Sequence, residues 1–320
     1  MVRNFSVQRL VRRFTVLAVV LCWSQLMGVH AQATPAPACP TLGDLPTRLA
    51  HGMWAKTVAG FTINRRAEPD LQSLRSGQIP NGDIMRVADG PVCSDGYVWW
   101  LLNYDSMMGW TAEGDVQEGS YWLEAVGKIV ASAPDSSEPD GCLQPPEVYD
   151  RIELGDVTLN LRTLAMLDHA QELYRAEGGI IHLRESIMQG SYNPGGVSAS
   201  FGTHDGGGAL DLSVRQIGTG KVLTEEIKPL LHALRLAGFA AWLRDFDELY
   251  TGSPIHIHAV AIGDAELSEA ARGQIDGTFG YFRGFNGLPQ DKGIPLPDTS
   301  GEMVICDWMQ ARGYGDMRGE

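Results

Sequence analysis

Short apolar runs separated by turn residues fill residues 46–124 of the 320-residue chain. Five runs are rich in residues that favour strands: AKTVAG, FTINRRA, DIMRVADG, YVWWLLNY and MGWTA. Turn-forming residues stand between them, as at Pro80-Asn81-Gly82 and Asp89-Gly90-Pro91. Many short strands at this spacing predict a small all-β barrel over residues 46–126.

Helical periodicity begins after residue 148. Two segments repeat apolar residues every three or four positions; the first ends at Gly178-Gly179, and the second is entered near Pro229 and closed by Gly238. The runs IIHLRESIMQ, FAAWLRDF and IHIHAVAI read as strands. Helices mixed with short strands predict an α+β domain over residues 148–288. Residues 289–320 form a tail with no evident chemistry.

The N-terminal residues have the pattern of a targeting segment. Arg9, Arg12 and Arg13 precede an apolar run over residues 14–29, and small residues follow it. This order predicts a secretory signal peptide over residues 1–33. The alternative is an uncleaved membrane anchor, although the run is shorter than the ~20 residues that span a bilayer. Linkers rich in alanine, serine and proline are predicted at residues 34–45 and 127–147.

Charge and cysteine content agree with export. The net charge of −14 leaves no basic face for a phosphate backbone, so nucleic acid is not an expected partner. Once the signal peptide is removed, four cysteines remain, an even number compatible with two disulfides outside the cell. We favour the pairs Cys39–Cys93 and Cys142–Cys306, one for each domain, although sequence alone leaves three pairings open. A lipid-carrying Cys39 is a weaker alternative.

Metal-type ligands gather in two short segments. His204 and Asp211 stand seven positions apart across a glycine-rich bend, in THDGGGALDL. His256 and His258 alternate along IHIHAV, so both side chains point to one face of a strand. Histidine and carboxylate ligands with an open fourth position are typical of catalytic zinc.

The first domain resembles a bacterial SH3-like (SH3b) module. The residues that carry the likeness are INRR at 63–66, IPNG at 79–82, GYVWW at 96–100 and Gly109-Trp110. Such modules commonly bind cell-wall peptides or other extracellular ligands, so the resemblance implies a targeting role. The aromatic candidates for a binding groove are Trp99, Trp100, Trp110 and Trp122.

Residues 150–288 resemble the D-Ala-D-Ala carboxypeptidase (M15) and hedgehog zinc superfamily, through THDGGGALDL and IHIHAV. The resemblance implies one zinc ion per chain, held by His204, Asp211 and His258. It implies that His256 stabilises charge on the scissile carbonyl oxygen. Arg184 is the counterpart of an arginine that grips a substrate carboxylate. Gln189 and Ser200 are weaker candidates for substrate contacts.

One feature of the family's peptidases is missing. They place an acidic general base three to six residues before the last zinc-binding histidine, where this chain has Gly252-Ser253-Pro254-Ile255. Asp245, Asp247 or Glu248 could serve only by folding back toward the metal-bound water. The general base is therefore not identified from the sequence.

Three functions follow from these patterns. The leading one is a secreted or cell-surface, extracytoplasmic bacterial zinc metallopeptidase that acts on peptidoglycan stem peptides, with the SH3-like module holding it near the cell wall. The second is a zinc-stabilised, non-catalytic extracellular binding protein. The third is a two-domain binding module without metal. We expect a monomer with no membrane contact after signal cleavage. The predicted fold is multidomain, an all-β SH3-like barrel followed by an α+β zinc-peptidase-like domain.

Overall fold

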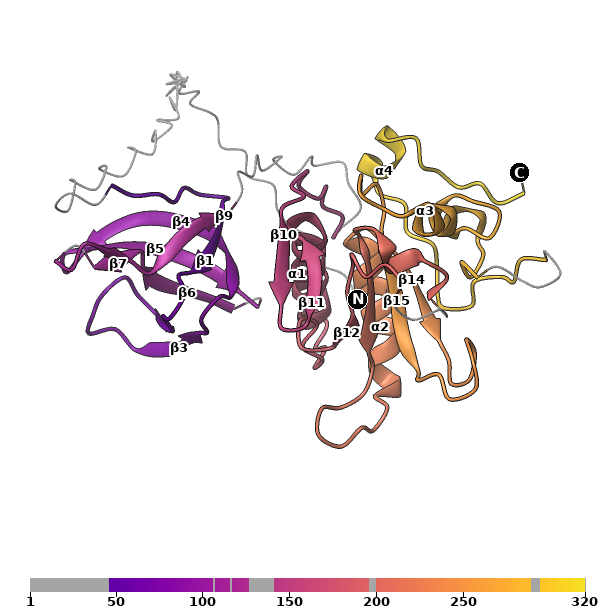
Figure 1. Ribbon diagram of the computed structural model, residues 1–320, viewed down its shortest axis with the longest axis horizontal. Helices are drawn as coiled ribbons and strands as arrows, with labels where there is room; N and C mark the ends of the chain where they lie inside the picture. The colour runs from indigo at the N-terminus through magenta and orange to yellow at the C-terminus, as the bar shows by residue number, and fades with distance from the viewer. Residues whose placement is uncertain are drawn as a thin grey trace, which may run out of the picture. The chain divides into compact units, whose positions relative to one another are not determined.

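The first half of the chain forms one curled antiparallel sheet in the computed structural model, which describes residues 46–105, 107–115, 117–126, 141–195, 200–288 and 294–319 (Figure 1). The sheet has the order β3-β2-β6-β5-β4-β1-β9. Its strands are β1 (Trp54–Thr57), β2 (Ile63–Arg66), β3 (Arg75–Ile79), β4 (Ile84–Ser94), β5 (Tyr97–Tyr104), β6 (Met107–Ala112) and β9 (Leu123–Val126). A two-stranded ribbon joins β7 (Gly114–Asp115) to β8 (Ser120–Tyr121). The predicted β-rich first half is confirmed.

Alternation along β5 sends neighbouring tryptophans to opposite sides of this sheet. Trp100 packs into a core with Ile79, Met85 and Leu102, and its indole N–H donates to the Glu113 carboxylate at 2.8 Å. Trp99 faces the other way but is also buried, and its N–H donates to the Ser94 carbonyl at 3.0 Å. Both rings therefore stabilise the fold.

The second half mixes helices and strands, as predicted. The hairpin β10 (Arg151–Leu154) and β11 (Val157–Asn160) leads into α1 (Leu161–Ala176), where the Asn160 side chain caps the helix by accepting from the Thr163 N–H. A four-stranded sheet has the order β12-β13-β15-β14. Its strands are β12 (Ile187–Gln189), β13 (Ala209–Ser213), β14 (Phe239–Arg244) and β15 (His256–Ala261).

Helices and apolar side chains cover both faces of this sheet. One face packs Leu212, Ile257 and Ala241 against α1 and α2 (Thr224–Leu236). The other packs Ala240 and Val260 against α3 (Glu269–Ile275) and α4 (Asp307–Ala311). The remaining turns η2 (Thr203–Asp205) and η3 (Tyr281–Arg283) are 3-10 helices.

Two predicted boundaries differ from the structure. Helix α2 begins at Thr224, so Pro229 lies inside the helix rather than at its entry. The predicted tail is part of the fold, because Cys306, Trp308 and Met309 are buried in the second core cluster. Its apolar residues are too few and too scattered in the sequence to show this burial through periodicity.

The predicted disulfide Cys142–Cys306 is present, with 5.8 Å between the two Cα atoms. Cys39 lies outside the described residues, so its pairing with Cys93 stays a prediction. The predicted signal peptide, the linker at 34–45 and residues 127–140 of the second linker also lie outside them. Within the described ranges, no helix is long and apolar enough to cross a membrane.

Candidate metal centre

Strand register brings the candidate ligands onto one face of the four-stranded sheet. Asp211 of β13 lies opposite His258 of β15, and His258 lies opposite Trp242 of β14. Two residues away along β15, His256 lies opposite Arg244. Directly opposite residues of antiparallel strands share a face, and so do residues i and i+2 of one strand. The face therefore presents two histidines, a carboxylate and an arginine together.

His204 reaches this face from η2, which the glycine-rich bend joins to β13. Gly206 and Gly207 leave room for the segment that precedes α3, and the Gly207 N–H donates to the Glu266 carbonyl at 2.7 Å. Gly208 has a φ of +77°, a conformation that glycine adopts without a steric penalty. The predicted tight turn is thus the means by which His204 and Asp211 meet.

The ligand atoms converge as a metal site requires. One atom each from His204, Asp211 and His258 lie within 4.8 Å of one another. His258 Nδ1 is 2.7 Å from Asp211 Oδ1, and His204 Nε2 is 3.4 Å from the same oxygen. Both imidazoles are buried. The sequence prediction that two distant segments meet at this triad is confirmed.

The second nitrogen of each imidazole shows which atom faces the site. His204 Nδ1 lies 2.8 Å from the Gly190 carbonyl, and His258 Nε2 lies 2.9 Å from Gln274 Oε1 on α3. An oxygen of this kind only accepts, so each of these nitrogens donates its proton. In a neutral ring, the other nitrogen then presents a lone pair to Asp211.

This arrangement fits a bound cation. Lone pairs of His204 Nε2 and His258 Nδ1 would face carboxylate oxygens, a repulsive contact that a metal ion or a proton between them relieves. His204 Nε2 is buried with no hydrogen-bond partner among the described residues. Acceptors behind metal-binding histidines are the usual means of fixing ring orientation. The His204, Asp211 and His258 group could therefore hold a metal ion.

Electrostatics agree that Asp211 remains ionised. Burial alone would raise the pKa of its carboxyl, but contacts with His204 and His258 hold that pKa well below its usual range. Burial opposes protonation of His204, yet Asp211 outweighs it and raises the pKa of that ring. Burial dominates at His258 and lowers its pKa. The group thus combines one anionic ligand with two imidazoles.

His256 stands beside the triad rather than within it. Its Nδ1 lies 2.8 Å from the Pro254 carbonyl, and its Nε2 lies 3.8 Å from Asp211 Oδ2. The ring lines the same cavity as the three candidate ligands. Its role beside a substrate carbonyl stays a prediction.

The other residues predicted to contact substrate differ in whether they line this cavity. Ser200 lines the cavity, and its hydroxyl accepts from Gln189 Nε2 at 3.2 Å. Arg184 is not among the lining residues. Its guanidinium donates twice to Asp168, at 2.8 and 2.6 Å, and once to the Ile84 carbonyl at 2.8 Å. Arg184, in the segment before β12, therefore connects this segment to α1 and to the start of β4.

The described cavity contains one carboxylate, that of Asp211. Of the three acids considered as a general base, none lines it: Asp245, Asp247 and Glu248. Asp247 Oδ1 accepts from the Gly252 N–H at 2.6 Å, and Glu248 Oε2 accepts from the Asp245 N–H at 2.7 Å. Their loop is held by these bonds.

Two residues of the site were not predicted from the sequence. Gln274 comes from α3 and orients His258, as described above. Arg244 ends β14 and lines the cavity although it is only 1% exposed. A signal was present for Arg244, because a charged residue in the apolar run FAAWLRDF must be buried if the strand is covered on both faces. Gln274 carried no such signal.

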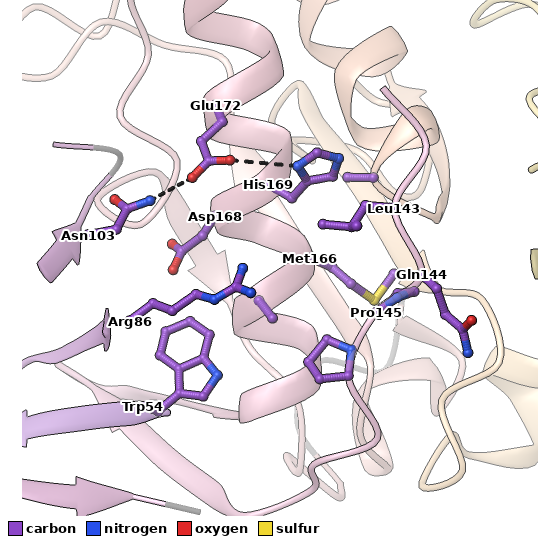
Figure 2. A pocket seen from close by; sticks show the side chains of 13 residues that line it. Trp54, Arg86, Asn103, Leu143, Gln144, Pro145, Met166, Asp168, His169 and Glu172 are labelled. Atoms are coloured by element: carbon purple, nitrogen blue, oxygen red, sulfur yellow. Dashed lines mark hydrogen bonds and ion pairs between the residues drawn. The ribbon is translucent and has the colours of Figure 1, made fainter. Parts of the chain in front are cut away.

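A second cavity lies elsewhere in the unit Ala38–Glu320, beside α1 (Figure 2). Glu172 accepts from Asn103 Nδ2 at 2.6 Å and lies 3.7 Å from His169 Nδ1, as the dashed lines in Figure 2 show. Trp54 and Met166 supply apolar walls. Among the described residues, the metal-ligand group identified by geometry is the one on the four-stranded sheet.

Comparison with known proteins gives no further guide to this site. No protein-family model, no curated protein and no solved structure matches the chain. The class that the geometry itself defines is a β-rich protein with a mixed second half and a buried group of two histidines and one carboxylate that could hold a metal ion.

Proposed function

We propose that the chain is a zinc metallopeptidase of the D-Ala-D-Ala carboxypeptidase type that acts on peptidoglycan stem peptides. The convergence of His204, Asp211 and His258 within 4.8 Å carries the proposal. Three nitrogen and oxygen ligands with an open fourth position suit catalytic zinc. The order of the ligands, with His-x6-Asp before His-x-His, is the order in that superfamily. We propose the same superfamily for the fold of the second half.

Zinc bound there would lower the pKa of a water molecule toward ~7 and polarise a carbonyl group. Peptide hydrolysis adds the hydroxyl of water to the carbonyl carbon and passes a proton to the leaving nitrogen as the C–N bond breaks. Residues of the chain would orient the metal ligands and stabilise charge for this step. Gly190 and Gln274 fix the candidate ligand rings, and His256, which lines the same cavity, is proposed to stabilise charge on the carbonyl oxygen.

The first half supports a targeting role in this proposal. Tyr97, Trp99 and Trp122 line a groove on its sheet, with Tyr97 stacked on Trp122 at 5.9 Å between ring centroids. Aromatic walls of this kind suit extended peptides or sugars. We propose that this half is an SH3-like module that binds the cell wall. A disulfide is typical of proteins that work outside the cell, which fits export.

A second function is favoured by one observation. No carboxylate other than Asp211 lines the described cavity, so no acidic base faces the metal position. A zinc-stabilised extracellular binding protein would need none. The two functions share the metal and differ in hydrolysis.

Metal analysis and a cleavage assay test the proposal together. Purified mature protein is expected to hold about one zinc per chain, because the described residues contain one group of three candidate ligands. It is expected to release a product from muropeptides. His204→Ala should lose both zinc and cleavage, whereas His232→Ala, on the exposed side of α2, should keep both.

The outcomes separate the functions. Zinc without hydrolysis would replace the peptidase with the non-catalytic binding protein. Wild-type protein without zinc after loading would remove both and leave an extracellular binding module.

A further inference from the structure

The cavity beside α1 shares no lining residue with the candidate metal cavity (Figure 2). Its apolar walls include Trp54 of β1, Met166 of α1 and the pair Pro145-Pro146, which follows the disulfide at Cys142. Proline has a fixed φ, so the chain has little conformational freedom at this wall. The cavity has a volume of about 70 Å³, room for about five water molecules or for one ligand of similar size.

Arg86 of β4 brings a cationic group to this cavity. Figure 2 shows its guanidinium pointing toward Met166. The described residues give this side chain no hydrogen bond and no ion pair, and it is half-buried with none of its nitrogens among the buried unpaired atoms. A ligand can therefore reach the nitrogens. A guanidinium donates paired hydrogen bonds to a carboxylate, so Arg86 suits an anionic group.

Glu172 of α1 supplies an anionic group to the same cavity. Its Oε1 accepts from Asn103 Nδ2 at 2.6 Å, which orients the carboxylate, and its Oε2 lies 3.7 Å from His169 Nδ1. Burial raises the pKa of Glu172, but contacts with His169 and Asn103 outweigh burial and hold that pKa below its usual value. A separation of 3.7 Å is beyond hydrogen-bond distance, so Oε2 can accept from a ligand ammonium group.

The other carboxylate that lines the cavity, that of Asp168, is already paired. Both of its oxygens accept from Arg184, at 2.8 and 2.6 Å. The cavity therefore offers one cation, Arg86, and one anion, Glu172. A purely anionic ligand would face Glu172, and a purely cationic ligand would face Arg86. A ligand that carries both charges complements the cavity best.

We infer that this cavity binds a free α-amino acid with a small side chain. The carboxylate of the amino acid binds Arg86, its ammonium group binds Glu172, and the walls at Trp54 and Met166 receive its side chain. The volume of the cavity limits the ligand to a small amino acid such as alanine. The inference goes beyond the proposed function, because it concerns a different cavity and needs no metal.

Calorimetry with alanine on the purified mature protein provides the test. Both enantiomers are used, and each is compared with N-acetylalanine, which lacks the ammonium charge, and with alaninamide, which lacks the carboxylate. Alanine should bind at least about 10-fold more tightly than either derivative, because each derivative loses one charged contact. Arg86→Met and Glu172→Gln should each weaken the binding of alanine by about 10- to 100-fold for the same reason.

Matched variants control for general effects of charge. Arg75→Met on β3 and Glu153→Gln on β10 remove the same charges outside the cavity, and both should bind alanine as wild type does. Glu172→Gln keeps an oxygen that can accept from Asn103, so its loss of binding reports the charge rather than the fold. His204→Ala should keep alanine binding, because this ring belongs to the candidate metal centre.

The inference is overturned if neither enantiomer binds to wild type, or if both derivatives bind as tightly as alanine. It is also overturned if Arg86→Met and Glu172→Gln bind alanine like wild type, or if His204→Ala abolishes binding, which would place the amino acid at the metal position. The comparison of ligands on wild type decides the matter even where a substitution unfolds the protein. The proposed function is tested separately, by zinc content and muropeptide cleavage.

Discussion

Asp211 receives contacts from three imidazole rings, and acceptors behind those rings determine their orientation. Two acceptors are main-chain carbonyls, of Gly190 and Pro254, and the third is the side chain of Gln274. Such groups fix the tautomer of a ligand histidine and raise its basicity. Metal affinity is therefore expected to depend on residues that never touch the metal.

Gln274→Leu tests this dependence. The variant removes the acceptor of His258 Nε2, so the ring loses its orientation, and zinc affinity should fall by about 10- to 100-fold. Competition with a chromogenic chelator measures the change. Gln274→Glu retains an acceptor at this position and should bind zinc at least as tightly as wild type. Equal affinity in the leucine variant would show that the ring is held by packing alone.

The sequence predicted the ligands at this scale but not their surroundings. His204, Asp211 and His258 are recognisable because spacing and strand alternation limit where their side chains can meet. Main-chain acceptors such as Gly190 have no residue type that marks them. Arg184 was expected at the site because an arginine on the preceding segment can grip a carboxylate. Its actual partner, Asp168 on α1, is a tertiary neighbour that spacing does not predict.

Among the elements, the bend between η2 and β13 determines whether the ligands meet. Gly206 has extended backbone angles that any residue adopts, yet a Cβ there would lie 2.4 Å from both Glu266 O and Ser268 N. The requirement for glycine is therefore the close approach of another backbone segment.

Gly206→Ala should destabilise the fold by about 1 to 3 kcal/mol, the usual effect of overpacking, and should displace His204. Urea unfolding and zinc titration would both record it. Gly315→Ala is the matched control, because a Cβ there meets nothing within 4 Å. Unchanged stability of Gly206→Ala would mean that the segment before α3 moves away freely.

The glycines at 206–208 show what a local sequence pattern can predict and what it cannot. Their run predicted a tight bend next to a strand, which the structure contains. The segment that packs on Gly206 lies about sixty positions later in the chain, and no local pattern reveals it. The predicted start of α2 near Pro229 was wrong for a similar reason. Burial of the apolar face of α2 stabilises a helix that continues through Pro229.

At the scale of the whole molecule, the disulfide joins residues 164 positions apart and fastens α4 to the segment before β10. Closing so long a loop restricts the unfolded chain strongly, so its loss is costly. A Cys142→Ala/Cys306→Ala variant should be less stable by about 3 to 5 kcal/mol.

Urea unfolding under non-oxidising and non-reducing conditions, with metal removed by a chelator, measures this difference. His232→Ala again serves as a control at an exposed position. A double variant as stable as wild type would show that packing of Trp308 and Met309 alone holds α4 in place.

Part of the cover of the four-stranded sheet comes from α4, after the last strand in the sequence. Strand β15 completes the sheet at Ala261, but Trp308 packs against the turn at Gly238 from residues made much later. Helix α3 covers part of the same face, and α4 covers another part although it comes well after β15 in the sequence. The sheet that carries the candidate metal ligands therefore depends, for part of its cover, on a segment that follows its last strand.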